Sequence, residues 1–293
     1  MNVLVTGASG FIGRHCVEAL SRTDAMVHCV SRREPDDQTD DRVRWHSFDL
    51  LSREPVEGLI ERIRPTHLLH LAWCVTPGTY LEDEENFDWV AASLDLVRAF
   101  RASGGSRVVC TGTCAEYDWS TGAYGEDDAQ AEPRNPYAAS KAGLRSLLSV
   151  MDGLSVVWPR LFFVFGPGEH PDKLVSSAIA AFRSGRSPAL GDPGAVRDFV
   201  YVKDVATALA GLIYDTTCGP VNVSSGVGTP VGRLVGKVGE ILGISVALED
   251  ADASPTSSCV GPNTLIREAT GWAPRYTLEA ALEEMIALTT EPE

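Results

Sequence analysis

The sequence lacks any apolar run close to the roughly 18 residues of a membrane-spanning helix, so we expect no membrane partner. The stretch Met1 to Val5 has no basic region or cleavage site, and we expect it to form a strand and not a signal peptide. Positive charge is scarce: 25 Lys and Arg face 40 Asp and Glu, and the net charge of −15 argues against a nucleic-acid partner. The seven cysteines are odd in number and have no CxxC spacing, which argues against a disulfide framework and against a metal site. We therefore expect a cytoplasmic protein that captures anionic ligands through local positive features.

What the sequence does contain is an alternation of short apolar strands with helices over 293 residues. The expected strands are Asn2–Thr6, Met26–Val30, Val43–Phe48, Leu68–Leu71, Arg107–Thr111, Leu154–Leu161 and Val221–Val223. The expected helices are Arg14–Arg22, Arg53–Arg64, Asn86–Ala102, Asp172–Gly185 and Asp204–Tyr214, with further helices opened by Pro136, Pro230 and Thr277. This alternation predicts right-handed crossovers and an α/β fold with a doubly wound parallel sheet, the Rossmann fold.

A glycine-rich turn joins the first strand to the first helix. Its residues Gly7, Ser9, Gly10, Phe11, Ile12 and Gly13 follow a G-x-x-G-x-x-G spacing. Glycines in this position let the backbone turn tightly and let a pyrophosphate approach the N-terminus of the helix, where the dipole favours negative charge. Glycine also serves turns for steric reasons alone. The position between strand and helix makes dinucleotide binding the favoured interpretation.

The end of the second strand indicates which dinucleotide is preferred. An acidic residue there would bind the ribose hydroxyls and repel a 2′-phosphate, but this chain has Ser31, Arg32 and Arg33. Guanidinium groups suit phosphate binding, so NADPH is favoured, with NAD as the alternative. The other interpretation is a solvated basic loop facing the acidic run Glu34 to Asp41. Asp49 and Leu50, after the third strand, are expected beside the adenine.

Tyr137 and Lys141 lie four residues apart at the start of a helix, and so share one helical face. A nearby ammonium favours the phenolate and makes a tyrosine a better acid–base group. Thr113, after the fifth strand, can converge on the same point with its hydroxyl. A Tyr-x-x-x-Lys spacing also occurs by chance, so the interpretation depends on this context.

Longer motifs make the chain resemble an extended short-chain dehydrogenase/reductase of the nucleotide-sugar epimerase/dehydratase kind. They are 6–13 (TGASGFIG), the Tyr137/Lys141 pair, 160–168 (RLFFVFGPG) and 197–205 (RDFVYVKDV), spread over nearly the whole length. The resemblance implies that Tyr137 is the acid/base, that Lys141 lowers its pKa and holds the nicotinamide ribose, and that Thr113 polarises the substrate oxygen.

The resemblance also implies the remaining contacts and the organisation of the chain. Further cofactor contacts are expected from Leu71, Ala72, Trp73, Thr111 and Phe162, and substrate contacts from Thr113, Cys114, Ala115, Phe163 and Arg197. Arg197 is expected on the sugar-nucleotide diphosphate, the alternative being a surface ion pair with Asp198 or Asp192. We expect a cofactor domain at 1–163, a substrate lobe at 164–293 from which the chain returns near 200–225, and a homodimer.

Departures from the family pattern narrow the reaction. Dehydratases carry Thr-Asp-Glu where this chain has Thr113-Cys114-Ala115, and Glu116 is out of register for their proton chemistry. Segment 112–119 also resembles that of deoxysugar 4-ketoreductases. With Arg32 and Arg33, these features favour NADPH-dependent reduction of a 4-keto group on a nucleotide-activated 6-deoxyhexose, and the resemblance implies dTDP as the nucleotide. An NAD-dependent 4-epimerase is the alternative, and a non-enzymatic nucleotide sensor is a third reading, disfavoured because both Tyr137 and Lys141 are present.

Two further expectations concern the strand ends and the loops above them. His70 is expected to be a satisfied core histidine and not a catalyst. Trp73, Tyr80, Tyr117 and Trp119 fall on loops, where some would cover the ligands and others would only pack. The loop 73–85 is expected to act as a lid.

Overall fold

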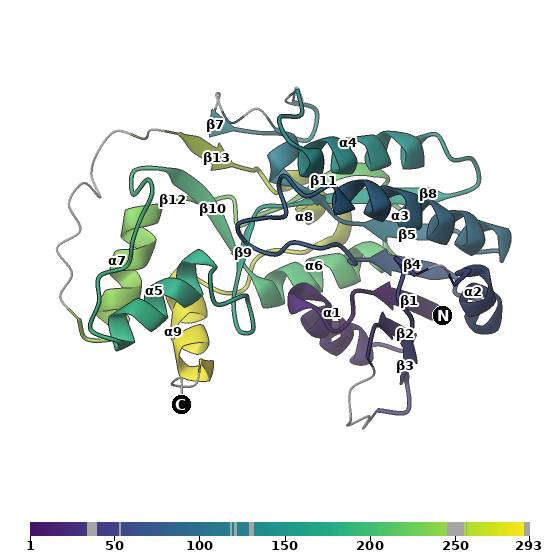
Figure 1. Cartoon of the computed structure of the whole chain (residues 1–293), viewed down its shortest axis with the longest axis horizontal. Helices are drawn as coiled ribbons and strands as arrows, with labels where there is room; N and C mark the ends of the chain where they lie inside the picture. The colour runs from purple at the N-terminus through teal and green to yellow at the C-terminus, as the bar shows by residue number, and fades with distance from the viewer. Residues whose placement is uncertain are drawn as a thin grey trace.

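The computed structural model describes residues 1–33, 40–52, 54–117, 119, 122–128, 132–244, 255 and 257–289. Its largest feature is a parallel sheet whose strands follow the order β11-β8-β5-β4-β1-β2-β3 (Figure 1). These strands are β1 (Asn2–Thr6), β2 (Met26–Ser31), β3 (Val43–Ser47), β4 (His67–His70), β5 (Arg107–Cys110), β8 (Ser155–Leu161) and β11 (Gly219–Val223). The short β6 (Gly112–Thr113) adds to β8. The predicted Rossmann sheet is confirmed.

Helices cover both faces of this sheet, as Figure 1 shows. One face carries α1 (Phe11–Ser21) and α6 (Val202–Tyr214), and the other carries α2 (Glu57–Ile63), α3 (Glu85–Ala102) and α4 (Pro136–Ser149). Each face of the sheet has its own hydrophobic core, and successive residues of β1 point into opposite cores. Val3 and Val5 pack in the core with α1 and α6, and Leu4 packs in the core with α2, α3 and α4. Burial on both faces explains why a central strand such as β1 is a nearly continuous apolar run.

A second, smaller sheet follows the order β12-β10-β13-β7, with β9 also paired to β10. Its strands are β7 (Gly122–Ala123), β9 (Phe163–Phe165), β10 (Val196–Tyr201), β12 (Gly228–Pro230) and β13 (Ser258–Val260). The helices α5 (Leu174–Arg183), α7 (Val231–Ile241) and α9 (Leu278–Leu288) share a third core with it at the left of Figure 1.

The chain crosses between the two sheets several times. After β10, helix α6 and strand β11 return to the large sheet, while β7, from the first half of the chain, pairs with β13. Helix α8 (Thr264–Thr270) also packs on the core of the large sheet through Ile266. The proposed division at residue 163 remains a prediction, and these crossings show that neither sheet is built from one continuous segment.

Several expected element bounds were wrong by a few residues. Helix α1 begins at Phe11 and not at Arg14, because Gly10 already occupies the N-cap position. Helix α2 begins at Glu57; the expected start, Arg53, lies outside the described residues. Within the described ranges no helix is both long and apolar enough to span a membrane.

Candidate functional site

The glycine turn after β1 is packed too closely for side chains. Gly7 has φ +66°, and a Cβ there would lie 2.8 Å from the Ala72 backbone nitrogen. A Cβ at Gly13 would lie 2.1 Å from the Gly7 carbonyl oxygen. The N-cap residue of α1 is Gly10, which has no side chain to accept a hydrogen bond from the first turn of the helix. The backbone N–H groups of that turn are therefore open to an anion. The turn therefore fits the pyrophosphate of a dinucleotide.

The residues expected to choose between NADP and NAD lie at the ends of β2 and β3. The Ser31 hydroxyl donates to the Arg33 carbonyl, and the Arg32 and Arg33 side chains are exposed. Asp49 is exposed, and its Oδ1 accepts the Leu51 N–H at 3.1 Å. Leu50 packs on the sheet core. Of the acidic run weighed as a partner for the arginines, residues 34–39 lie outside the described residues.

Helix α4 presents the Tyr137/Lys141 pair to the ends of the central strands. Its N-cap is Asn135, whose Oδ1 accepts the Ala138 N–H at 2.9 Å, and Pro136 follows in the first turn. Tyr137 and Lys141 are buried at 8% and 4% exposure. The Tyr137 side chain is hydrogen-bonded to that of Thr113. The expected convergence of a hydroxyl and a phenol is therefore present in the structure.

Burial dominates the electrostatics of the pair. It raises the pKa of Tyr137 well above the usual value, while the Thr113 hydrogen bond lowers it. Burial lowers the pKa of Lys141 to about 8. The Lys141 ammonium donates to the Thr111 carbonyl at 3.0 Å and lies 3.7 Å from the centre of the Trp73 ring. The action of Lys141 on the Tyr137 pKa remains a prediction.

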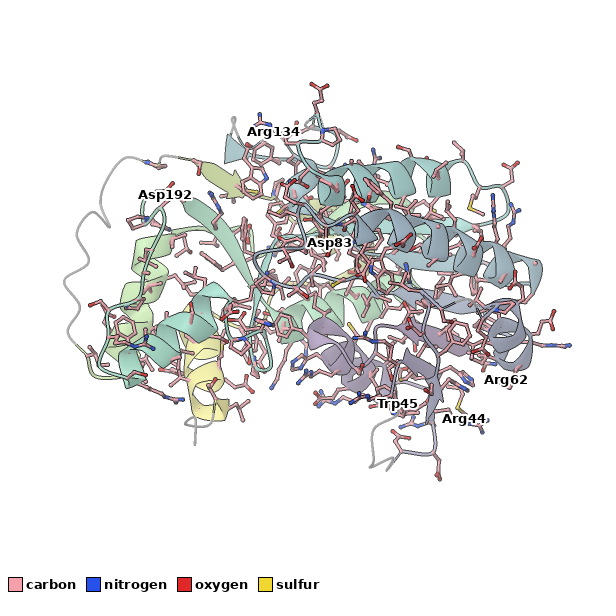
Figure 2. The ribbon with its side chains drawn as sticks, viewed as in Figure 1. Arg44, Trp45, Arg62, Asp83, Arg134 and Asp192 are labelled. Atoms are coloured by element: carbon pink, nitrogen blue, oxygen red, sulfur yellow. The ribbon has the colours of Figure 1, made fainter. Side chains whose placement is uncertain are left out.

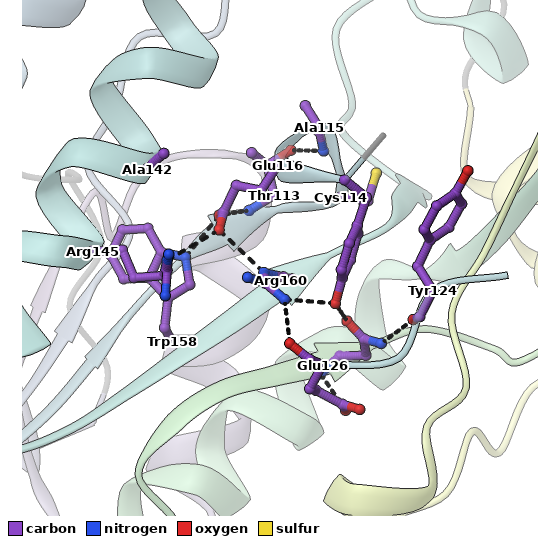
Figure 3. Close-up of polar contacts among 12 residues, drawn as sticks. Thr113, Cys114, Ala115, Glu116, Tyr124, Glu126, Ala142, Arg145, Trp158 and Arg160 are labelled. Carbon is purple, nitrogen blue, oxygen red and sulfur yellow. Dashed lines mark hydrogen bonds and ion pairs between the residues drawn. The ribbon is translucent and has the colours of Figure 1, made fainter. Parts of the chain in front are cut away.

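The turn that carries Thr113 is a short 3-10 helix, η1 (Cys114–Glu116), closed by a capping box. Thr113 Oγ1 accepts the Ala115 N–H at 3.1 Å, and Glu116 Oε1 accepts the Thr113 N–H at 3.1 Å. Both oxygens of Glu116 have further partners (Figure 3): Oε1 also accepts from Trp158 Nε1 at 2.7 Å, and Oε2 accepts from Arg160 Nε at 3.1 Å. The neighbouring carboxyl residue, Asp118, lies outside the described residues.

The Arg197 side chain packs against two neighbouring aromatic rings, those of Trp119 and Phe163. Its guanidinium carbon lies 5.0 Å from the Trp119 ring centre and 5.5 Å from that of Phe163. Its Nη2 donates to Ser257 Oγ at 3.0 Å. The carboxylate of Asp198, weighed as its partner, instead accepts from the N–H groups of loop 225–226 at 2.7 and 3.0 Å. The diphosphate contact of Arg197 remains a prediction.

Two thiols connect the catalytic turn to the small sheet. Cys114 is hydrogen-bonded to Cys259 of β13, and burial further raises its pKa, so it behaves as a packing residue. All seven cysteines are free thiols.

Phe162, expected on the cofactor, is buried, and its ring centre lies 6.3 Å from that of Tyr117. His70 is confirmed as a core histidine, since its nitrogens bond Thr6 Oγ1 at 2.7 Å and Ser93 Oγ at 2.8 Å.

Sequence reasoning missed Asn86, which organises the loop above the site. Its Oδ1 accepts from Trp73 Nε1, and its Nδ2 donates to the carbonyls of Tyr80 and Asp83, each at 2.7 Å. Nothing in the sequence distinguished this asparagine from a polar residue on an exposed helix face. Its 2% exposure comes from the tertiary fold alone.

Comparisons with known proteins agree with this geometry. The fold and the Tyr/Lys site define a nicotinamide-dependent enzyme class, and the profile of the NAD dependent epimerase/dehydratase family matches residues 3–222. The chain belongs to that family. Both reductases and epimerases are among its relatives, so the family leaves the reaction open.

Three relatives illustrate the range. The GDP-6-deoxy-D-mannose reductase of Pseudomonas aeruginosa is 26% identical over 97% of this chain and 96% of its own. The UDP-glucose 4-epimerase of Rhizobium meliloti is 24% identical over 96% and 95%. The structure of the Thermus thermophilus UDP-glucose 4-epimerase with NAD superposes with a TM-score of 0.82 at 29% identity, covering 98% of each chain.

Proposed function

We propose that the protein reduces the C4 keto group of a nucleotide-activated 4-keto-6-deoxyhexose with NADPH, with dTDP as the expected nucleotide. The observation that carries the proposal is the catalytic turn. Thr113 is hydrogen-bonded to Tyr137. The three residues after Thr113 are Cys114, Ala115 and Glu116, and the Glu116 carboxylate is already bound to Arg160. Elimination of water needs free acid–base carboxyls beside the sugar, whereas ketone reduction needs one proton donor.

The chain's own groups supply that donor. Burial keeps the Tyr137 phenol protonated at neutral pH, as an acid that protonates a carbonyl oxygen must be. The Thr113 hydroxyl would donate a hydrogen bond to the same oxygen and orient it. Lys141 would bind the nicotinamide ribose hydroxyls, and the bound nicotinamide would supply the hydride that C4 receives. Arg197 would hold the diphosphate and so fix the sugar over the coenzyme.

The preference for NADPH rests on the exposed Arg32 and Arg33 at the end of β2. NAD is the alternative, because the family is NAD-dependent and the Thermus thermophilus relative holds NAD. Titration of the purified protein with NADPH and NADH, followed by nicotinamide fluorescence, compares the two. Tighter binding of NADH would contradict the preference.

The second candidate, an NAD-dependent 4-epimerase, is supported by the epimerases among the relatives. An epimerase regenerates its coenzyme in each turnover, whereas a reductase consumes it. We expect loss of NADPH absorbance with a panel of 4-keto-6-deoxy nucleotide sugars. Purified protein that carries tightly bound NAD and interconverts sugars without added coenzyme would overturn the reductase proposal.

The variant Tyr137→Phe separates an enzyme from a nucleotide sensor. Removal of the phenolic proton should lower kcat by about 10²- to 10⁴-fold while coenzyme binding is retained. Reduction at the wild-type rate would show that Tyr137 is not the acid. The homodimer and the cytoplasmic location remain predictions; light scattering of the purified protein tests the first.

A further inference from the structure

The loop between β4 and α3 places one aromatic ring against each member of the catalytic pair. Trp73 lies over the Lys141 ammonium at 3.7 Å, and the Tyr80 ring meets the Tyr137 ring edge-on with centres 4.9 Å apart. The loop is also joined to α4 through its backbone, since the Leu81 carbonyl accepts the Tyr137 N–H at 3.1 Å.

The position of the Trp73 ring is determined by contacts on two other sides. Asn86 accepts the indole N–H at 2.7 Å and simultaneously holds two carbonyls of the same loop. Trp89 stacks on the ring with centres 6.2 Å apart, and its own N–H donates to Glu85. The ring is therefore held between α3 and Lys141, and these contacts fix the rotamer of the Trp73 side chain.

An ammonium at this depth needs compensation. Lys141 has three N–H donors, and the Thr111 carbonyl accepts one of them at 3.0 Å. Burial removes water from the charge, and the negative face of an indole is the strongest aromatic partner for a desolvated cation. The Trp73 ring thus opposes the effect of burial on the lysine.

We propose that Trp73, clamped by Asn86, is a positioning residue for Lys141: its ring keeps the buried ammonium charged and aimed at the site. This role rests on the proposed function for its catalytic meaning, but the contact itself is independent of the substrate. Loop 73–85 then holds Tyr137 and Lys141 in place through fixed contacts, in addition to covering the site.

Other titratable groups that face Lys141 come from three elements packed against it. They are Cys110 of β5, Glu116 of η1 and His70 of β4. Burial raises the pKa of Cys110 to about 12 and lowers that of His70 to about 3. Glu116 is paired with Arg160. Between about pH 5 and pH 10, Lys141 therefore titrates without a change of charge at Cys110 or His70.

The composition of the chain makes this titration measurable. The sequence contains only Lys141, Lys173, Lys203 and Lys237, and Lys141 is the buried one. Protein labelled with ¹³C-lysine gives one ε-carbon signal for each, and Lys141→Arg assigns the signal of interest by its loss. The pKa of Lys141 is then read from the pH dependence of its chemical shift, with no substrate present.

Trp73→Leu replaces the ring by a smaller aliphatic side chain and should lower the Lys141 pKa by about one unit, the shift that a desolvated cation–π contact gives. Trp73→Phe keeps a weaker ring and should lower it by less than half of that shift. The matched control is Trp45→Leu, because Trp45 lies on the edge strand β3 (Figure 2), which β1 and β2 separate from β4, and it should leave the pKa unchanged.

An unchanged or raised Lys141 pKa in Trp73→Leu would overturn the proposal. If that variant does not fold, Trp73→Phe decides, since a pKa equal to that of the unaltered protein would also overturn it. In turnover assays the alkaline limb of kcat/KM should move down by the same amount. If the Lys141 pKa falls as expected in Trp73→Leu but the unaltered protein has no reductase activity, the proposed function is wrong and the positioning role of Trp73 stands.

Discussion

Thr113 has two roles that depend on the same hydroxyl. Its Oγ1 accepts the Ala115 N–H at 3.1 Å, which caps η1, and the side chain is hydrogen-bonded to Tyr137. The first contact shapes the turn, and the second brings the hydroxyl to the proton donor. Under the proposed function, catalysis and local stability are therefore linked at this residue.

We expect Thr113→Val to lower kcat by about a hundredfold, because the isosteric methyl group can neither orient a substrate oxygen nor bond the phenol. Loss of the cap should also cost about 1 kcal/mol of unfolding free energy. Thr113→Ser keeps the hydroxyl and serves as the control. Steady-state kinetics and urea unfolding measure the two effects; a Val variant with wild-type kcat would remove Thr113 from the mechanism.

Burial determines how much the Glu116 carboxylate contributes to the unfolding free energy. Its side chain is fully buried with Arg160, whereas Glu18 pairs with Arg22 with about half or more of each side chain exposed. Glu116→Gln should lower the unfolding free energy by about 3–5 kcal/mol, because it leaves a buried guanidinium without its counter-charge. Glu18→Gln should change it by less than about 1 kcal/mol. Equal effects in urea unfolding would contradict this account.

At the scale of the element, α4 carries Tyr137 and Lys141, the pair proposed to be catalytic. Its N-cap, Asn135, lies two residues before Tyr137. Helix α9 has the same kind of cap, in which Thr277 Oγ1 accepts the Ala280 N–H at 3.2 Å, but it lies in the small lobe. The two helices allow the cost of a lost cap to be separated from its effect on the site.

Asn135→Ala and Thr277→Ala should each lower the unfolding free energy by about 1 kcal/mol. Only Asn135→Ala should also lower kcat, since fraying of the first turn of α4 displaces Tyr137. Thermal unfolding and steady-state kinetics of the two variants give the comparison. A similar fall of kcat in Thr277→Ala would show that the effect reflects general stability.

At the scale of the whole molecule, four buried groups respond to acid in opposite directions. Burial lowers the pKa of His28 to about 4 and of His70 to about 3. It raises the pKa of Glu169 to about 7 and of Asp198 to about 6. The histidines contribute stability that is lost as the pH falls below about 6.5, whereas the carboxyls contribute stability that is lost as the pH rises through their folded pKa values.

Acidification from about pH 7 to pH 5 therefore acts on the unfolding free energy in both directions, and single variants should expose the opposing slopes. Relative to the unaltered protein, His70→Gln should shift the slope towards a gain of stability on acidification, and Glu169→Gln should shift it towards a loss. Each slope changes by up to about 1.4 kcal/mol per pH unit. Urea unfolding at several pH values in this range measures the slopes; parallel curves for the two variants would contradict the assignment.

The parts of the fold that sequence predicted well are those governed by local patterns. Strand β1, the glycine turn, the Pro136 start of α4 and the Thr277 cap depend on neighbours within a few residues. Element ends were less accurate, as at Phe11, because capping and turn contacts set them. The crossing of β7 into the small sheet had no local signature, since two residues cannot show a period.

The sequence by itself determined the alternation of strands and helices, the glycine turn and the Tyr137/Lys141 pair, because spacing along a strand or helix dictates which side chains share a face. Only the tertiary structure decided which polar residues face the site. It buried Glu116 against Arg160, packed Arg197 against two rings and set Trp73 over Lys141 through Asn86. These contacts join residues from separate elements, and their energies depend on desolvation, which no spacing along the chain encodes.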